Sequence, residues 1–526
     1  MKRKLIIGSR GSDLALWQAN YIQDKLKKLG AISEINVIKT QGDKIQDLSF
    51  DKMEGKGFFT KEIEESLLAQ EIDLAIHSYK DLETTQPEEL QIAAVSVRED
   101  PSDLLLINKS AYDVKRKLCL KDSAIVGTSS ARRKSQMLGF RSDICLKDLR
   151  GNVPTRIQKL RDGGYDAILL ASAGVNRLEI DLSDFHVEIL DPTEFIPAPA
   201  QGVLACQIRK EDEDLAKLLN DINEEKVADS VHVEREVLSL FEGGCQMPVG
   251  VYCECDEDDD ENAIYKVWVA KSDHSNIPPI LSYTESKNRN TLAEKVVNVY
   301  KDIKPGKVFI TRELRKDDHF ANVLNGNKYS VSGKSLIKIQ LVDFKARLQE
   351  TNFGWVFFSS KQAVKYFFMQ NPDCKEVKYG AIGKSTAAAL RRFGKSADFI
   401  GYSTDTKMTG KQFASSVGNE RVLFPQAKGS MRTIQQQFYN KKQVVDLIVY
   451  DTLVLEDFAI PVFDTILFTS PSNVRAYMKH NVLNTDKKVV AMGDATGNEL
   501  KKFGVNVFNK PSSFSDAGLA QAVFSS

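Results

Sequence analysis

Residues 154–171 read Pro154-Thr-Arg-Ile-Gln-Lys-Leu-Arg-Asp-Gly-Gly-Tyr-Asp-Ala-Ile-Leu-Leu-Ala171, and this stretch carries the pattern that decides the fold. Pro154 suits the first turn of a helix, and the pair Gly163-Gly164 ends it. The apolar run Tyr165–Ala171 that follows is typical of a buried strand. A helix followed at once by such a strand is the repeating unit of α/β proteins.

The same alternation of short apolar strands and amphipathic helices continues through the first 200 residues. Ser12 is a helix-capping residue, and the helix after it runs to about Leu29, where Gly30 ends it. Similar patterns predict strands at Leu5–Gly8, Leu74–His77 and Ala124–Gly127, and helices near Lys61–Gln70 and from Ser130. We therefore predict an α/β fold with mainly parallel sheets.

Residues 251–270 have a different character. Val251–Cys255 and Tyr265–Ala270 flank the acidic segment Asp256–Glu261 and predict a hairpin. A helix is expected near Leu292–Ile303. This combination predicts a small α+β domain, and Lys304-Pro-Gly-Lys307 is typical of a linker after it.

The C-terminal part of the chain repeats itself at an offset of 110 residues. Trp355-Val-Phe-Phe-Ser-Ser360 matches Thr465-Ile-Leu-Phe-Thr-Ser470, and Ala381-Ile-Gly-Lys-Ser-Thr386 matches Ala491-Met-Gly-Asp-Ala-Thr496. Gly394 and Gly504 form a third pair at the same offset. A constant offset over three blocks indicates an internal duplication. We predict two similar α/β lobes with a cleft between them.

Composition narrows the class of protein. The chain has 526 residues, with Lys+Arg and Asp+Glu balanced at 72 each, which argues against a nucleic-acid scaffold. The apolar run Leu5–Ile7 is far shorter than the roughly 7–15 residues of a signal-peptide core, and no stretch reaches the roughly 18 apolar residues of a membrane span. The seven cysteines are irregularly spaced, as expected for reduced thiols, and we expect no metal. We therefore predict a cytoplasmic protein that binds neither nucleic acid nor membrane. We also expect a monomer, although composition does not determine the oligomeric state.

Basic residues recur where the predicted strands end. Ligands of open α/β sheets bind beyond the carboxyl ends of the strands. The residues at these positions are Arg10, Lys80, Arg132, Arg133, Arg150, Arg156 and Arg177. Free N–H groups at helix starts combined with guanidinium groups favour a polyanionic ligand, although each residue taken singly could be a solvated surface cation. The phosphate-binding pattern G-x-x-x-x-G-K-[ST] is absent, so carboxylates are at least as good a match as phosphates.

Two further residues have the chemistry of a reaction site. Asp81 is an acid among bases, and it could stabilise a developing cation or move a proton, or it could simply pair with a neighbouring cation. Cys245 follows Gly243-Gly244 and precedes Pro248, which predicts a loop. A thiol there could be a nucleophile, an attachment point or a bystander.

Over roughly residues 1–303 these segments together resemble hydroxymethylbilane synthase, also called porphobilinogen deaminase. The matching blocks are Ser9-Arg-Gly-Ser-Asp-Leu-Ala-Leu-Trp17, His77-Ser-Tyr-Lys-Asp81, Gly127-Thr-Ser-Ser-Ala-Arg-Arg133, Leu149-Arg-Gly-Asn-Val-Pro-Thr-Arg156, Ser172-Ala-Gly-Val-Asn-Arg177, Pro197-Ala-Pro-Ala-Gln-Gly202 and Gly243-Gly-Cys-Gln-Met-Pro248. The family usually has Met or a similar apolar residue where this chain has Tyr79, and often Pro where it has Glu83.

The resemblance implies a covalent dipyrromethane cofactor on Cys245, built from the substrate porphobilinogen. Asp81 would be the acid and base that assists the loss of ammonia. The residues implied to bind the cofactor and the growing chain are Arg10, Lys80, Arg132, Arg133, Arg150, Arg156 and Arg177, with Ser78, Ser129 and Ser130 adding hydrogen bonds.

Residues 305–526 resemble uroporphyrinogen-III synthase, through the two duplicated blocks, Leu423-Phe-Pro-Gln-Ala-Lys-Gly429 and Val449-Tyr-Asp-Thr452. The implied reaction closes hydroxymethylbilane into a macrocycle and inverts the last ring. Tyr450 would be the acid, unless its role is structural. Substrate carboxylates would be held by Ser360, Ser470, Ser472 and Thr496, although Ser470 and Ser472 could simply cap helices.

These resemblances imply a division into domains. The first enzyme would have periplasmic-binding-protein-like α/β lobes at about 1–97 with 200–220 and at about 98–199, and the small α+β domain at about 221–303. The second would have lobes at about 304–342 with 455–526 and at about 343–454. Two rival hypotheses are a solute-binding module without catalysis and a C-terminal half that is only a structural or interaction module.

Overall fold

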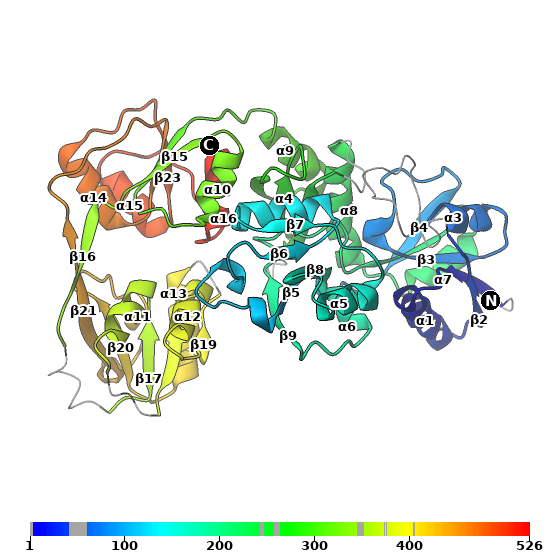
Figure 1. The fold of residues 1–526 in the computed structure, drawn as a ribbon, viewed down its shortest axis with the longest axis horizontal. Coiled ribbons are helices and arrows are strands. Elements are labelled where there is room, and N and C mark those ends of the chain that lie inside the picture. The colour runs from blue at the N-terminus through cyan, green and yellow to red at the C-terminus, as the bar shows by residue number, and fades with distance from the viewer. Residues whose placement is uncertain are drawn as a thin grey trace. The chain divides into compact units, whose positions relative to one another are not determined.

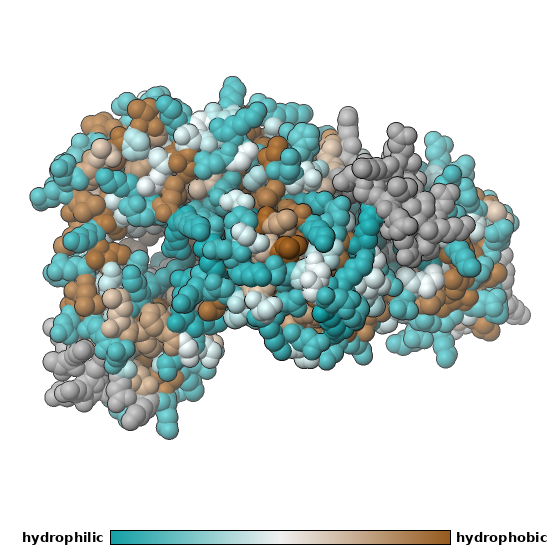
Figure 2. All heavy atoms as spheres, viewed as in Figure 1, coloured by the Kyte–Doolittle hydropathy of each residue, from teal (hydrophilic) through white to brown (hydrophobic). Residues whose placement is uncertain are grey.

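The computed structural model describes residues 4–40, 60–241, 247–256, 263–344, 352–372, 374, 376–402 and 405–525 (Figure 1). It divides into two compact units. The first comprises Met1–Gly306, Arg315–Ser330 and Asp516–Ser526, and the second comprises Lys307–Leu314 and Val331–Ser515. Among the described residues, no helix is both long enough and apolar enough to cross a bilayer. Hydrophilic and hydrophobic residues are interspersed on the face that Figure 2 shows.

The first sheet of the first unit has the strand order β2-β1-β3-β10-β4. Its strands are β1 (Leu5–Ser9), β2 (Ser33–Val37), β3 (Leu74–Ser78), β4 (Leu90–Val95) and β10 (Leu204–Arg209). One face packs against α1 (Asp13–Lys28) and α7 (Glu213–Asn220), and the other against α3 (Lys61–Leu68). Ser12 caps α1 as predicted, because its side chain accepts a hydrogen bond from the Ala15 N–H.

The second sheet has the strand order β7-β6-β8-β5-β9. Its strands are β5 (Asp103–Asn108), β6 (Ile125–Gly127), β7 (Cys145–Lys147), β8 (Ala167–Ala171) and β9 (Phe185–Leu190). Helix α4 (Ala131–Phe140) covers one face and α5 (Val153–Arg161) the other, and the short α6 (Ser172–Arg177) follows β8. The helix and strand predicted within residues 154–171 are therefore α5 and β8.

The expectation of mainly parallel sheets was wrong, because both sheets are mixed. The chain crosses between them twice, through residues 96–102 and 191–203. The strands that follow these crossings, β5 and β10, are the ones that run antiparallel to their neighbours. The two crossings touch each other: Gly202 has φ +89, and a Cβ there would lie 2.2 Å from the Glu99 carbonyl oxygen. Such close backbone contact requires glycine.

The predicted hairpin is present as part of a three-stranded antiparallel sheet of β11 (Val249–Asp256), β12 (Ile264–Lys271) and β13 (Ile280–Ser286). Strand β13 was not predicted, and most of the acidic segment lies outside the described residues. Helices α8 (Glu225–Leu240) and α9 (Leu292–Val299) pack on this sheet through a shared core that includes Val233, Val237 and Val296.

Two helices from beyond residue 304 also belong to the first unit. Helix α10 (His319–Gly326) packs against α4, where the His319 ring stacks on Phe140 with centroids 3.8 Å apart. Helix α16 (Asp516–Phe524), which is apolar on all sides and buried, packs against β13. The first compact unit therefore contains segments that the predicted domain boundaries place in the second enzyme, and those boundaries stay a prediction.

The second unit contains two sheets. The four-stranded sheet has the order β15-β14-β22-β23, formed by β14 (Lys307–Ile310), β15 (Ser330–Gly333), β22 (Thr465–Phe468) and β23 (Lys488–Ala491). The six-stranded sheet has the order β16-β21-β20-β17-β18-β19, formed by β16 (Ile337–Leu341), β17 (Trp355–Phe358), β18 (Lys378–Ala381), β19 (Phe399–Ile400), β20 (Val422–Ala427) and β21 (Val444–Val454). The helices are α11 (Lys361–Phe368), α12 (Lys384–Arg391), α13 (Thr406–Val417), α14 (Pro471–His480) and α15 (Asp494–Lys502).

The sequence duplication has a structural counterpart. Strand β17, α11, β18 and α12 start at residues whose numbers differ by 110 from the starts of β22, α14, β23 and α15. The equivalent caps Ser360 and Ser470 have the same backbone conformation (φ −162 and −164), and each accepts a hydrogen bond from the N–H three residues later. The repeated blocks thus form the same strand–helix–strand–helix succession, once in each sheet.

Candidate active site

All of the predicted basic residues except Arg132 meet at one cavity of about 570 Å³ in the first unit. They come from the loops and helices that follow the strands, and the carboxyl ends of β1, β3 and β8 face this space. The predicted site residues that line it are Arg10, Ser78, Lys80, Asp81, Arg133, Arg150, Arg156 and Arg177. Six of these eight side chains carry positive charge at neutral pH and one carries negative charge, so the cavity suits an anionic ligand.

Lys80 and Asp81 lie in a single turn of 3₁₀ helix, η2 (Tyr79–Asp81), directly after β3. Ser78, at the end of that strand, accepts a hydrogen bond from the side-chain amide of Gln18 at 2.8 Å. Asp81 is exposed to the cavity, whereas Lys80 is partly covered. A carboxylate surrounded by cations at a solvent-accessible surface can accept or donate a proton, and it can stabilise a nearby positive charge.

Arg132 and Arg133 have different surroundings although they are adjacent in α4. Both bind the carboxylate of Asp103, which is fully buried: Arg132 Nη1 donates at 2.7 Å and Arg133 Nη2 at 2.6 Å. Arg132 also donates to the Ile196 carbonyl, and it does not line the cavity, whereas Arg133 does. Burial alone would raise the pKa of Asp103, but the two guanidinium groups outweigh it and hold the pKa well below its usual value.

Gln201 connects this ion pair to the turn at the cavity. Its side-chain N–H₂ donates to Asp103 at 3.1 Å, and its oxygen accepts from Lys80 Nζ at 3.2 Å. Burial lowers the pKa of Lys80 to about 8, and Arg133 and Arg132 lower it while Asp81 and Asp103 raise it. Sequence reasoning missed Asp103 as a site residue, although an acid at the start of the apolar run Asp103-Leu-Leu-Leu-Ile107 was a visible signal.

Arg156 and Arg177 complete the cationic wall. Arg156 Nε donates to the Gly151 carbonyl at 2.7 Å, and burial, reinforced by Arg133 and Arg150, lowers the pKa of Arg156 to about 10. Arg177 Nη2 donates to the Gly202 carbonyl at 2.6 Å. This hydrogen bond joins Arg177, which lines the cavity, to residues 191–203, the second segment that crosses between the two sheets.

Three predicted residues contribute differently or lie outside the described residues. Ser129 exchanges hydrogen bonds with the backbone of Leu149, at 2.9 Å and 3.1 Å, and it does not line the cavity. Ser130 caps α4 by accepting from the Arg133 N–H. Cys245 falls in the segment 242–246, outside the described residues, so its place relative to the cavity stays a prediction.

In the second unit the structure brings Tyr450 and Ser360 together, with their hydroxyl oxygens 3.3 Å apart. Burial raises the pKa of Tyr450, Ser360 lowers it through this hydrogen bond, and Tyr366 raises it. Ser470 caps α14, Ser472 accepts from Arg475, and Thr496 is buried in α15. Within the described residues no hydrogen bond links these three to the Tyr450–Ser360 pair.

Comparisons with known proteins assign both parts of the chain. Residues 5–217 match the family model "Porphobilinogen deaminase, dipyromethane cofactor binding domain", and residues 228–277 match "Porphobilinogen deaminase, C-terminal domain". Residues 334–521 match the model "Uroporphyrinogen-III synthase HemD".

Among individual relatives, the porphobilinogen deaminase of a Nitratiruptor species is 42% identical over 293 residues, covering 56% of this chain and 92% of that protein. The porphobilinogen deaminase of Clostridium novyi is 42% identical over 261 residues, covering 49% and 86%. The solved uroporphyrinogen-III synthetase of Helicobacter pylori is 16% identical, with 41% of this chain and 98% of that chain covered and a TM-score of 0.32. A periplasmic binding protein of Salmonella typhimurium with high arginine specificity is 14% identical, with 43% and 94% covered and a TM-score of 0.26.

The chain belongs to the porphobilinogen deaminase family, and it carries a uroporphyrinogen-III synthase domain behind the deaminase in the same polypeptide.

Proposed function

We propose that this chain catalyses two consecutive steps of tetrapyrrole synthesis. The first part condenses four porphobilinogen molecules into hydroxymethylbilane with release of ammonia, and the second closes hydroxymethylbilane to uroporphyrinogen III with inversion of the last ring. The observation that carries the first step is a single cavity lined by seven basic residues and by only two acidic ones, Asp13 and Asp81. Porphobilinogen brings two carboxylates, so a chain of linked pyrroles is a polyanion that such a cavity can bind.

The residues of the cavity fit a dipyrromethane primer. Two linked pyrroles bear four carboxylates, and the lining supplies several guanidinium groups together with Lys80. Among these, Arg133, Arg150 and Lys80 would hold the primer, whereas Arg10, Arg156 and Arg177 would hold the incoming substrate and the growing chain. When bound, the primer supplies the pyrrole carbon to which each new substrate is joined. We propose Cys245 as its point of attachment.

Asp81 carries the proton chemistry in this proposal. Loss of ammonia from porphobilinogen requires a proton at the departing amine and leaves positive charge on the pyrrole. A carboxylate that is solvent-accessible and held at the end of β3 can transfer that proton and stabilise the charge. Lys80 beside it, with a pKa of about 8, would be protonated at neutral pH and can bind a substrate carboxylate.

Arg132 would act on the cavity through Asp103 rather than by direct contact. Its guanidinium is occupied by Asp103 and by the Ile196 carbonyl. Together the two arginines and the aspartate bear a net charge of +1. Part of the positive charge of this group therefore lies close to the cavity that Arg133 lines. This arrangement supports a role for Arg132 in orienting Arg133.

For the second step, Tyr450 is the proposed acid. A phenol with a raised pKa stays protonated over the working pH range and can donate its proton to the hydroxyl group that leaves. Ser360 would orient the phenol through their hydrogen bond. Ser470, Ser472 and Thr496 would bind substrate carboxylates in this proposal.

The mass of the intact protein as purified tests the first step. We expect a covalent excess corresponding to two linked pyrroles, and loss of that excess in Cys245→Ala. Cys145, an exposed cysteine of β7, offers a matched control, because Cys145→Ala should keep the excess. A protein that carried no excess and released no ammonia from porphobilinogen would be a binding module instead of a deaminase.

The isomer of the product tests the second step. Hydroxymethylbilane left alone closes without inversion, so a functional second half should yield the type III isomer and an inactive one the type I isomer. Chromatographic separation of the two isomers decides between an enzyme and a purely structural module.

A further inference from the structure

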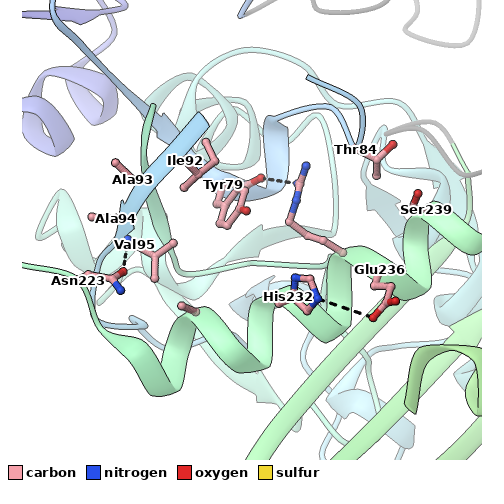
Figure 3. Close-up of a pocket in the computed structure, with 12 residues that line it drawn as sticks. Tyr79, Thr84, Ile92, Ala93, Ala94, Val95, Asn223, His232, Glu236 and Ser239 are labelled. Carbon is pink, nitrogen blue, oxygen red and sulfur yellow. Dashed lines mark hydrogen bonds and ion pairs between the residues drawn. The ribbon is translucent and has the colours of Figure 1, made fainter. Parts of the chain in front are cut away.

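The turn that carries Lys80 and Asp81 has a second face, which points away from the cationic cavity. Tyr79, the first residue of the same turn, lines another cavity of about 450 Å³ together with Thr84 of the following loop and His232, Arg235 and Glu236 of α8. Figure 3 shows Tyr79 between strand β4 and helix α8, with His232 and Glu236 on the helix side of the same space. The three residues of η2 thus lie between the two cavities, with Tyr79 lining one and Lys80 and Asp81 lining the other.

The turn has little internal support. A 3₁₀ helix of three residues makes few hydrogen bonds of its own, and here the Leu82 N–H donates to the Tyr79 carbonyl at 3.3 Å. Among the described residues, no side chain caps its start. The Tyr79 N–H donates to the Val203 carbonyl at 2.9 Å, which fixes the start of the turn but not its end.

The guanidinium of Arg235 adds hydrogen bonds to the backbone of the turn and of the two residues after it. Its Nη1 donates to the carbonyls of Tyr79 at 3.2 Å and Leu82 at 3.1 Å, and its Nη2 donates to the carbonyl of Glu83. The same group lies over the Tyr79 ring, 4.5 Å from the centroid. Hydrogen bonds from a charged donor are stronger than neutral ones, and the planar fork reaches several acceptors at fixed angles, which an ammonium group cannot do.

The helix that carries Arg235 is itself firmly anchored. The neighbouring Glu234 is fully buried and accepts from Arg98 at 2.6 Å, from the Ala200 N–H at 2.6 Å and from the Cys253 N–H at 2.8 Å. Arg235 therefore projects from a rigid base. Helix α8 ends at Leu240, five residues before Cys245 in the sequence. The helix whose Arg235 contacts the turn with Asp81 is therefore also the helix that precedes the proposed attachment residue.

We infer that Arg235 is a positioning residue of the deaminase reaction, which holds the backbone of residues 79–83 so that Lys80 and Asp81 keep their places in the cationic cavity. The inference rests on the proposed function of that cavity. Tyr79 is part of the same device, because its ring covers the guanidinium on one side.

Each variant is first weighed intact to measure the fraction that carries the covalent dipyrromethane. Its kcat is then calculated for that fraction alone, which is called the loaded protein. Arg235→Met should load and bind porphobilinogen with little change in KM, but its kcat should fall by about a hundredfold, as expected when a reacting group is displaced by about 1 Å. Its pH–kcat profile should also shift, because Lys80 and Asp81 change surroundings. Arg235→Lys should stay impaired, since it keeps the charge and loses the fork.

Controls separate positioning from stability. His232→Ala changes an exposed residue one turn earlier on α8, beside the same cavity, and should have the kcat of the wild type. Tyr79→Phe keeps the ring and should be close to the wild type, whereas Tyr79→Ala should be slower. If Arg235→Met cannot be recovered in loaded form, Arg235→Lys and Tyr79→Ala decide the matter. Loaded Arg235 variants with normal kcat and an unchanged pH profile would overturn the inference, whereas a wild-type protein that releases no ammonia would refute the proposed function itself.

Discussion

Replacing Asp103 with asparagine tests how the cationic cavity is held together. Asp103 is 0% exposed and accepts four hydrogen bonds, one from Arg132, two from Arg133 and one from Gln201. Asparagine has nearly the same shape but is neutral, and it offers one acceptor oxygen in place of two. The substitution therefore leaves two buried guanidinium groups without a compensating charge and turns an N–H₂ group toward one of them.

The expected cost is about 3–5 kcal/mol, the usual penalty for breaking a buried ion pair from one side. Because the chain has several domains, a single free energy of unfolding is not well defined. Hydrogen exchange as a function of denaturant, read in peptides from β5 and α4, gives the local value. Asp184→Asn is the matched control, since the Arg161–Asp184 pair is exposed, with side-chain exposures of 36% and 62%, and should cost about 0–1 kcal/mol.

The variant should also change the cavity. Asp103 raises the pKa of Lys80, so its neutralisation should lower that pKa further. If the local stability of β5 and α4 fell no more in Asp103→Asn than in Asp184→Asn, the buried triad would not be the element that organises the arginines, and Arg132 would have no part in orienting Arg133.

Three further predictions concern the two reaction sites. Because the pKa of Lys80 is lowered from its usual 10.5 to about 8, the unfolded chain binds more protons between these pH values, so this residue makes the protein more stable as the pH rises through that window. Over the same range the loss of its charge should weaken carboxylate binding; titration calorimetry with porphobilinogen should show this in the wild type and not in Lys80→Gln. Asp81→Asn should retain the covalent primer mass but lose about 10²- to 10⁴-fold in ammonia release, and a normal rate would remove Asp81 from the mechanism. Tyr450→Phe removes the hydroxyl that contacts Ser360 and should shift the product from type III to type I; an unchanged isomer ratio would show that the phenol is structural.

Several local features could be predicted because they depend on neighbours in the sequence. The cap at Ser12, the helix from Ser130 and the end of α1 just before Gly30 follow from short-range hydrogen bonding and from the conformational freedom of glycine. The duplication at an offset of 110 residues was also visible in the sequence. In the structure both copies form a strand, a helix, a second strand and a second helix in the same order. The basic residues at strand ends were identified by their positions alone.

Other features depend on which segments meet, and periodicity carries no such information. The antiparallel direction of β5 and β10, the third strand β13 and the place of α10 and α16 in the first unit are of this kind. The same holds for the clamp of Arg235 on residues 79–83, which joins segments more than 150 positions apart.

The sequence by itself determined the kinds of element, the set of cations and the membership of two families, because these follow from residue type, spacing and short-range bonding. Only the tertiary structure decided which cations face the cavity. Both Arg132 and Arg133 bind buried Asp103, but only Arg133 also lines the cavity, since adjacent side chains on a helix point about 100° apart. Burial and partner choice are properties of the packed chain, and the physical character of the site depends on them.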